Sequence, residues 1–223
     1  LGQTQKHIID KEHVSNLSNK GTQKRIMNKT PLNRAQMAAR VAQEFQDDWV
    51  VNLGIGIPTL CSNYCHPEKR IIFQSENGVI GCGPLAAEGS EDFHLVNAGG
   101  QHITLIPGAS IVHHADSFAI IRGGHVDVTV MGSYEVAENG DFANWKLHGR
   151  KGGSIGGAMD LAIGAKRVFI IMDHTTRDGR PRLLKQLTLP ATARMVVDLV
   201  MTNLGLFQVT PEGFMIREIA SGY

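Results

Sequence analysis

The run Val168-Phe169-Ile170-Ile171-Met172, written VFIIM, decides the fold class of this 223-residue chain. Consecutive apolar side chains point alternately to the two faces of a strand, so both faces must be covered, as in a parallel sheet between layers of helices. A helix is predicted at residues 158–164, just ahead of this strand. The run therefore predicts an α/β domain with a mostly parallel open sheet and helices on both of its faces.

The order of strand, glycine-rich loop and helix also occurs earlier in the chain. Residues 49–53 form a β-prone run that ends in a glycine loop before Pro58, a residue that can open a helix. Further strands are predicted at residues 71–74 and 126–131, each followed by a glycine-containing loop. Apolar residues at helical spacing predict a first helix within residues 32–45, which Asn33 can cap.

The bulk composition predicts one domain at residues 31–223. The chain is 42% hydrophobic, enough for one sizeable core. Residues 1–30 are polar and without period, so we expect a disordered leader or an added extension, with the natural start at Met27. No apolar run approaches the ~20 residues that span a bilayer, and no signal-peptide order is present at the N-terminus. These features favour a soluble, cytoplasmic protein without a membrane partner.

Charge, cysteine usage and glycine spacing exclude several classes of protein. The 22 Lys and Arg residues balance 21 Asp and Glu residues without a basic stripe, which argues against nucleic acid as a partner. Three cysteines favour reduced thiols. Cys61 and Cys65 could share a helical face near His66, but a closed zinc site needs further ligands, so no metal is expected. No glycine cluster matches a dinucleotide fingerprint or a phosphate loop, which disfavours a nucleotide cofactor.

Three polar residues mark a candidate site. Asn52, Glu76 and Asp173 each fall near the predicted end of a different strand. Ligands of open α/β sheets gather at the carboxyl ends of the strands, so these loops are expected to meet. Glycines in the neighbouring loops would let the backbone approach a ligand. Taken alone, however, Glu76 in the turn Glu76-Asn77-Gly78 is more simply explained as a solvated turn residue or a cap.

Six segments, in order along the chain, resemble the β subunit of family I CoA-transferases. They are VNLGIGIP (51–58), QSENGVIGCGP (74–84), NAGGQ (97–101), SFAIIRGGHVDV (117–128), DFANW (141–145) and GGAMDLAIGAKRV (156–168). The resemblance extends from about residue 32 to residue 223 and implies that family's fold. It also implies that Glu76 is a nucleophile that attacks an acyl-CoA and becomes an enzyme-CoA thioester. No permanently bound cofactor is implied, because the CoA thioester enters as a substrate.

The resemblance assigns expected roles to further residues. It implies that Asn52 and the backbone of Gly157 flank the reacting carbonyl and stabilise its oxyanion. The segments His-His-Ala-Asp-Ser-Phe at 113–118 and Met-Asp-His at 172–174 are similar to the subgroup that acts on 3-oxoadipate. The second carboxylate of such an acceptor needs a cationic or hydrogen-bonding partner. The candidate substrate-binding residues are His113, His114, Ser117 and Arg122.

The resemblance further implies a partner, an α subunit, in an α2β2 assembly that takes acyl-CoA and carboxylic acid substrates. Three alternatives stay open. The acceptor could be acetoacetate or another short-chain 3-oxo acid; water could attack the glutamyl-CoA thioester, as in an acyl-CoA hydrolase; or the chain could be a non-catalytic partner subunit. Residues 146–154, KLHGRKGGS, depart from the family's usual Met-Gly-Gly run and leave open how the loop before Gly156 closes.

Overall fold

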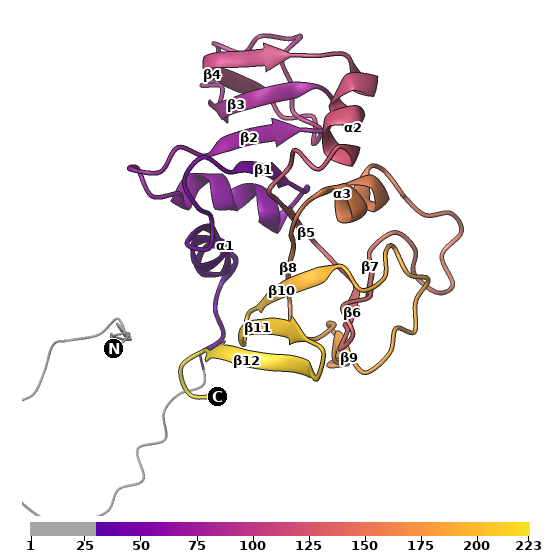
Figure 1. The fold of residues 1–223 in the computed structure, drawn as a ribbon. Helices are drawn as coiled ribbons and strands as arrows, with labels where there is room; N and C mark the ends of the chain where they lie inside the picture. Colours follow the sequence, from indigo (N-terminus) through magenta and orange to yellow (C-terminus); the bar gives the residue numbers. More distant parts are fainter. Residues whose placement is uncertain (1–29) are drawn as a thin grey trace, which may run out of the picture.

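The computed structural model describes residues 30–223 (Figure 1). The predicted leader and Met27 therefore lie outside the described residues, apart from Thr30, whose N–H donates to the Ser221 carbonyl at 3.3 Å. The N-terminal end of the described chain is thus hydrogen-bonded to its C-terminal end. None of the helices in this described part is long and apolar enough to cross a membrane.

A nine-stranded sheet forms the body of the fold, in the order β12-β11-β10-β8-β5-β1-β2-β3-β4. Five central strands are parallel to one another. They are β10 (Val197–Thr202), β8 (Val168–Met172), β5 (Val128–Met131), β1 (Val50–Leu53) and β2 (Ile72–Ser75). The predicted α/β class and the largely parallel sheet are therefore confirmed, and the strand predicted at VFIIM has the bounds expected for it.

Antiparallel strands extend the sheet on both sides. β3 (Val79–Leu85) and β4 (Ile103–Ile111) continue from β2, whereas β11 (Gly205–Thr210) and β12 (Gly213–Ile219) continue from β10. The sequence did not indicate these strands, because much of β4 and β12 is exposed and shows no clean alternation of apolar residues. The sheet is therefore mixed, with a parallel centre and antiparallel flanks. A separate three-stranded sheet contains β6 (Glu135–Ala137), β7 (Phe142–Ala143) and β9 (Leu183–Leu184).

Helices cover both faces of the large sheet, as predicted. The helix α1 (Arg34–Ala42) and the 3₁₀ helix η1 (Ile57–Tyr64) pack on one face, and α2 (His114–Arg122) and α3 (Ala158–Gly164) pack on the other. Strand β8 shows why the apolar run is continuous. Phe169 and Ile171 belong to the core under α1, whereas the alternate residues Val168, Ile170 and Met172 belong to the core under α2 and α3.

Local sequence signals explain how the helices begin. Asn33 and Gln36 form a reciprocal capping box at the start of α1, which confirms the expected cap. Gly56, at a φ of 97°, turns the chain out of β1, and Pro58 lies in the first turn of the helix that follows. That helix is 3₁₀ over eight residues, so the expected helix is present in the tighter form.

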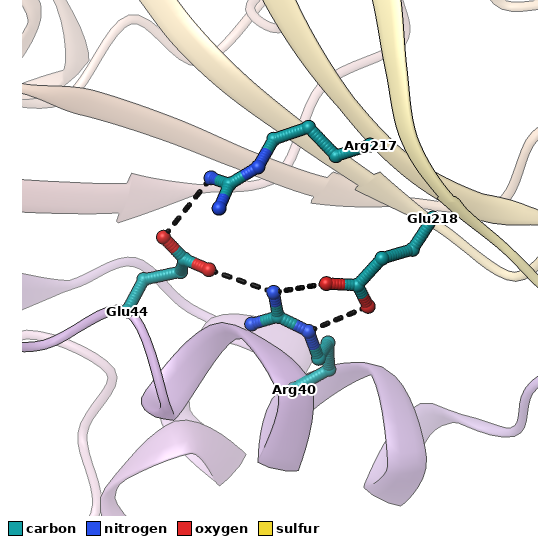
Figure 2. Close-up of polar contacts among 4 residues, drawn as sticks. All are labelled: Arg40, Glu44, Arg217 and Glu218. Atoms are coloured by element: carbon teal, nitrogen blue, oxygen red, sulfur yellow. Dashed lines mark hydrogen bonds and ion pairs between the residues drawn. The ribbon is translucent and has the colours of Figure 1, made fainter. Parts of the chain in front are cut away.

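A cluster of four charged residues joins α1 to the last strand of the sheet (Figure 2). The Nε atom of Arg40 donates to Oε2 of Glu218 at 2.7 Å, and its Nη2 atom also pairs with Glu218. The same Nη2 atom lies 2.8 Å from Oε1 of Glu44, whose other oxygen accepts from Arg217 at 3.2 Å. The cluster therefore joins the first helix of the described chain to the edge strand β12.

Candidate active site

The carboxylate of Glu76 is presented by a tight hairpin turn between β2 and β3. Ser75 pairs with Val79, which leaves the three residues 76–78 to make the turn. Gly78 has a φ of 120°, its N–H donates to the Ser75 carbonyl at 3.0 Å, and a Cβ on it would overlap the carbonyl oxygen of Val112. This position requires glycine, and the turn fixes Glu76 at the carboxyl end of a central strand.

A cavity of about 460 Å³ opens at the carboxyl ends of β1, β2 and β5. The sequence-predicted residues Asn52, Glu76 and Gly157 all line it. They come from a strand, a hairpin turn and the start of a helix that are far apart in the sequence, so the structure brings together the three residues expected at the reacting carbonyl. The volume is in the range of small-molecule sites.

The environment of Glu76 favours a poorly hydrated carboxylate. The residue is half-buried, and within residues 30–223 no hydrogen bond or ion pair reaches its carboxylate. Burial raises the pKa of Glu76; the positive charge of His114 lowers it in part, and the nearby Asp160 raises it. The amide of Asn77, which we expected to donate to Glu76, donates instead to the carbonyl of Val96 at 2.8 Å.

Gly157 lies directly against Glu76. A Cβ added to Gly157 would overlap Oε2 of Glu76, would lie 2.9 Å from its Cδ atom, and would lie 3.0 Å from Cζ of Phe118. Gly157 is the residue that caps the N-terminus of α3, with a φ of −87° and a ψ of 4°. The preceding Gly156 has a φ of 51° and turns the chain into the helix. The absence of a side chain at residue 157 is what makes room for the carboxylate.

Asn52 is held by a chain of buried hydrogen bonds. Its Nδ2 atom donates to Oε1 of Gln74 at 2.8 Å and to the Gln74 carbonyl at 3.2 Å, and its Oδ1 atom accepts from Thr129 at 3.4 Å. The Nε2 atom of Gln74 donates in turn to Oγ of Ser117 at 2.9 Å. All four side chains are buried. Ser117 therefore supports Gln74 and Asn52, and it does not line the cavity.

The other candidate residues lie away from the cavity wall. The Nδ1 atom of His113 accepts from the Ala115 N–H at 3.2 Å and caps α2, and the ring of His114 lies 4.8 Å from that of Phe118. The Nε atom of Arg122 donates to Asp160 at 2.7 Å. Asp173 follows β8 and is exposed. None of His113, His114, Arg122 and Asp173 lines the cavity, although the charge of His114 affects Glu76.

Several cavity residues were not expected from the sequence. They include Ala98, Ser133, Tyr134, Asn144 and Arg182. Asn144 lies in the segment DFANW, which could have indicated it; its Nδ2 atom donates to the Gly132 carbonyl at 3.2 Å. Arg182 lies in a polar loop with no sequence signal of its own. Ala98 is held beside the site because its N–H donates to Oγ of Ser75 at 2.8 Å.

A second cavity of about 310 Å³ adjoins the first, and both are lined by Leu53, Ile55, Ser75 and Ala98. Its walls are largely apolar and include Cys82, whose pKa is raised by burial to about 11. This thiol stays protonated at neutral pH, which disfavours it as a rival nucleophile. Among residues 30–223, no group of three or more His, Cys, Asp or Glu side chains is placed to hold a metal ion.

The arrangement suits acyl transfer to a carboxylate. A half-buried Glu76 is close enough to Gly157 for both to contact one small acyl group, and the buried amide of Asn52 lies on the same cavity. Carboxylates become better nucleophiles when they lose hydrating water, provided that they remain ionised. The site therefore offers a nucleophile together with an amide and a backbone at which an oxyanion could be stabilised.

Comparisons with known proteins agree with this chemistry. Residues 34–218 match the family described as Coenzyme A transferase. The B subunit of the 3-oxoadipate CoA-transferase of Pseudomonas putida is 47% identical over 192 residues, which cover 85% of this chain and 89% of that protein. The B subunit of the succinyl-CoA:3-ketoacid coenzyme A transferase of Helicobacter pylori is 43% identical over 189 residues, covering 85% and 91%. In fold, the chain is similar to the acyl-CoA transferase YdiF of Escherichia coli O157:H7, with a TM-score of 0.65 and 21% identity, covering 88% of this chain and 40% of that one.

Proposed function

The chain belongs to the coenzyme A transferase family, and from this premise we propose that it is the β subunit of a succinyl-CoA:3-oxoacid CoA-transferase that acts through Glu76. The observation that carries the proposal is the contact between the half-buried carboxylate of Glu76 and the backbone of Gly157, on a cavity that Asn52 also lines. No permanently bound cofactor is required, because the CoA thioester is itself a substrate.

The proposed reaction balances without an external energy source. An oxygen of Glu76 attacks the thioester carbonyl of succinyl-CoA, the C–S bond breaks, and CoA thiolate leaves a mixed anhydride. The thiolate attacks Cδ of Glu76, which releases succinate and forms a glutamyl-CoA thioester. The acceptor carboxylate then attacks Cδ and the same two steps run in reverse, so that acyl-CoA leaves and the carboxylate of Glu76 is restored.

Each step has an oxyanion that must be stabilised. We assign this task to the amide of Asn52 and the backbone N–H of Gly157, because both residues line the cavity with Glu76. In the present arrangement the Nδ2 atom of Asn52 donates to Gln74, so binding of an acyl group would exchange one of these bonds. Removal of one oxyanion donor typically lowers kcat by about 10²–10³-fold.

We propose 3-oxoadipate as the acceptor. The proposal is supported by the Pseudomonas putida relative, which is named for that acid, and by the segments at residues 113–118 and 172–174. The Helicobacter pylori relative, named for 3-keto acids, keeps acetoacetate as the competing acceptor. Transfer rates from succinyl-CoA to 3-oxoadipate and to acetoacetate compare the two directly; a preference for acetoacetate would contradict the proposed specificity and leave the reaction class intact.

We also propose a separate α subunit as the partner, in an α2β2 assembly. Both relatives are named as one of two kinds of subunit, which supports a two-chain enzyme. The cavity is open to solvent at Ile55 and Ile155, which are 73% and 48% exposed although both are large and apolar. A partner surface that covered them would bury apolar area and would exclude water from Glu76. Full activity of this chain alone would contradict the proposed partnership.

The test of the mechanism is chemical trapping at Glu76. The chain is co-purified with its α subunit, incubated with succinyl-CoA and reduced with borohydride, and the modified peptide is located by mass spectrometry. The expected result is reduction of the Glu76 side chain that depends on acyl-CoA and is lost in Glu76→Gln. An assembly that turns over without any modification of Glu76 would mean that the carboxylate is structural. Release of free CoA with no acyl-CoA product would favour a hydrolase.

A further inference from the structure

Arg182 is an unpaired cation on the wall of the proposed active site. It lies at the start of β9 and lines the same cavity as Glu76. Its backbone is fixed on both sides, because its N–H donates to the His174 carbonyl at 3.0 Å and its carbonyl accepts from the Val136 N–H at 2.9 Å. The guanidinium is therefore attached to a well-held backbone and not to a freely moving loop.

The hydrogen bonding of Arg182 is incomplete. Its Nε atom is buried and has no hydrogen-bond partner, and it is the single buried side-chain nitrogen or oxygen of this kind within residues 30–223. Arg122 and Arg180, in contrast, each donate from Nε to a carboxylate. A buried donor without a partner costs about 1–3 kcal/mol, and more when the group is charged. A cost of this kind at a cavity wall points to a ligand that satisfies the donor.

The chemistry of Arg182 selects an anion. A guanidinium offers a planar set of donors that matches a carboxylate in two-point geometry. Glu76 lines the same cavity but forms no ion pair with Arg182, so the arginine is available to a second negative group. Between the two, the buried side chains of Met131 and Leu161 give the cavity apolar wall suited to a short methylene chain.

We infer that Arg182 binds the distal carboxylate of dicarboxylic acyl groups, and so sets the preference of the enzyme for succinyl-CoA and for a dicarboxylic acceptor. This inference rests on the proposed role of Glu76, since the reacting carbonyl must lie there for the far end of the acyl chain to reach Arg182. Acyl groups that end in a methyl group leave the arginine unsatisfied and are disfavoured for that reason.

The experiment compares succinyl-CoA with butyryl-CoA, which has the same four acyl carbons but a methyl group in place of the distal carboxylate. The α-containing assembly of the wild type and of Arg182→Gln is used, and glutamyl-CoA formation is followed with each thioester. We expect Arg182→Gln to lower kcat/KM for succinyl-CoA by at least ~100-fold and to change it for butyryl-CoA by less than about threefold. Arg182→Lys, which keeps the charge but loses the two-point geometry, should fall between the two.

Arg180→Gln is the matched control, because Arg180 lies in the same loop, is exposed and pairs with Asp178. It should leave the ratio of the two thioesters unchanged. Equal losses with succinyl-CoA and butyryl-CoA in Arg182→Gln would overturn the inference, since the arginine would then serve the shared CoA moiety or the fold. A wild-type assembly that forms no adduct at Glu76 with either thioester would instead overturn the proposed function, and the two failures are thereby distinguished.

Discussion

Glu76 and Gly157 occupy one space: the carboxylate of the first packs where the second would carry its side chain. The two residues are 81 positions apart in the sequence, one in a hairpin turn and the other at the start of α3. Their contact fixes the direction of the carboxylate without a hydrogen bond. A nucleophile held by packing alone keeps its lone pairs available for attack, which is what the proposed mechanism needs.

Gly157→Ala should abolish transfer while leaving the fold intact. The backbone angles of Gly157 are accessible to alanine, but the new methyl group would push the Glu76 carboxylate and Phe118 aside. Misplacement by about 1 Å costs on the order of 10²-fold in rate, so we expect a loss of at least that size in kcat. Steady-state kinetics with succinyl-CoA, together with a thermal melt, measure both effects.

Gly132→Ala is the control for that variant. Gly132 lines the same cavity, and nothing lies within 4 Å of a Cβ built on it. This variant should change kcat by less than about threefold, because no side chain has to move. If Gly157→Ala and Gly132→Ala were equally active, the contact with Glu76 would have no part in catalysis.

The acid limb of the pH–rate profile should follow the charges around Glu76. Burial raises the pKa of Glu76, and the nucleophile must be ionised, so kcat/KM should fall as the pH drops through that raised value. His114→Gln removes a positive charge and should move the limb to higher pH. Asp160→Asn removes a negative charge and also releases Arg122, so it should move the limb to lower pH. Shifts of both variants in one direction would contradict this electrostatic account.

Glu76→Gln should stabilise the protein at neutral pH. A carboxyl group whose pKa is raised by folding contributes stability below its unfolded pKa and loses it as the pH rises through the folded value. The wild type at about pH 7 therefore carries a poorly hydrated charge that the amide lacks. We expect a higher Tm for Glu76→Gln at neutral pH and a smaller difference near pH 4. An unchanged or lower Tm at neutral pH would reveal a stabilising partner of the carboxylate.

Ser117→Ala distinguishes support of the site from contact with the substrate. The substitution leaves the buried Nε2 atom of Gln74 without its acceptor, which should cost about 1–3 kcal/mol in the free energy of unfolding. Because Gln74 positions Asn52, kcat should also fall, with little change in the KM of the acceptor. Ser90→Ala, at an exposed turn, is the control. A raised acceptor KM at unchanged stability would show that Ser117 contacts the substrate.

The charge cluster of Figure 2 should contribute measurably to stability. Arg40 is 19% exposed and pairs with Glu218 through two of its nitrogens, so Arg40→Ala should lower the free energy of unfolding by about 1 kcal/mol, less at high salt. Arg70→Ala, which removes an exposed pair with Asp48, should have no measurable effect. Denaturant titrations of the two variants test the difference; equal effects would mean that partial burial adds nothing to the Arg40 pairs.

The central strands could be predicted from the sequence because burial on both faces leaves a strong pattern. VFIIM must be covered on two sides, and its bounds agree with β8. The flanking strands β4 and β12 could not be predicted, because edge strands are exposed and carry apolar residues such as Met215 and Ile219 on their open side. Their pairing depends on the neighbouring strand and not on their own composition.

The site was predicted to a similar extent, and for a related reason. Residues at the ends of central strands must share one edge of the sheet, so Asn52 and Glu76 could be placed together before the fold was known. Asp173 obeys the same rule but is exposed, since the rule gives the edge and not the direction of a side chain. Arg182 lies in the basic stretch RDGRPR, where nothing in the sequence separates the one buried arginine from the exposed ones.

The strand order also determines when the site can exist during folding. The turn that holds Glu76 joins adjacent strands and can form early, whereas Val51 of β1 must find Val128 of β5, 77 residues further along the chain. Closing such a long loop is entropically costly and slow, and parallel pairings of this kind dominate the centre of the sheet. Asn52 and Gly157 reach Glu76 only after those pairings are made. Catalytic competence is therefore gained in the last stages of folding, and partly folded chains carry the nucleophile without its site.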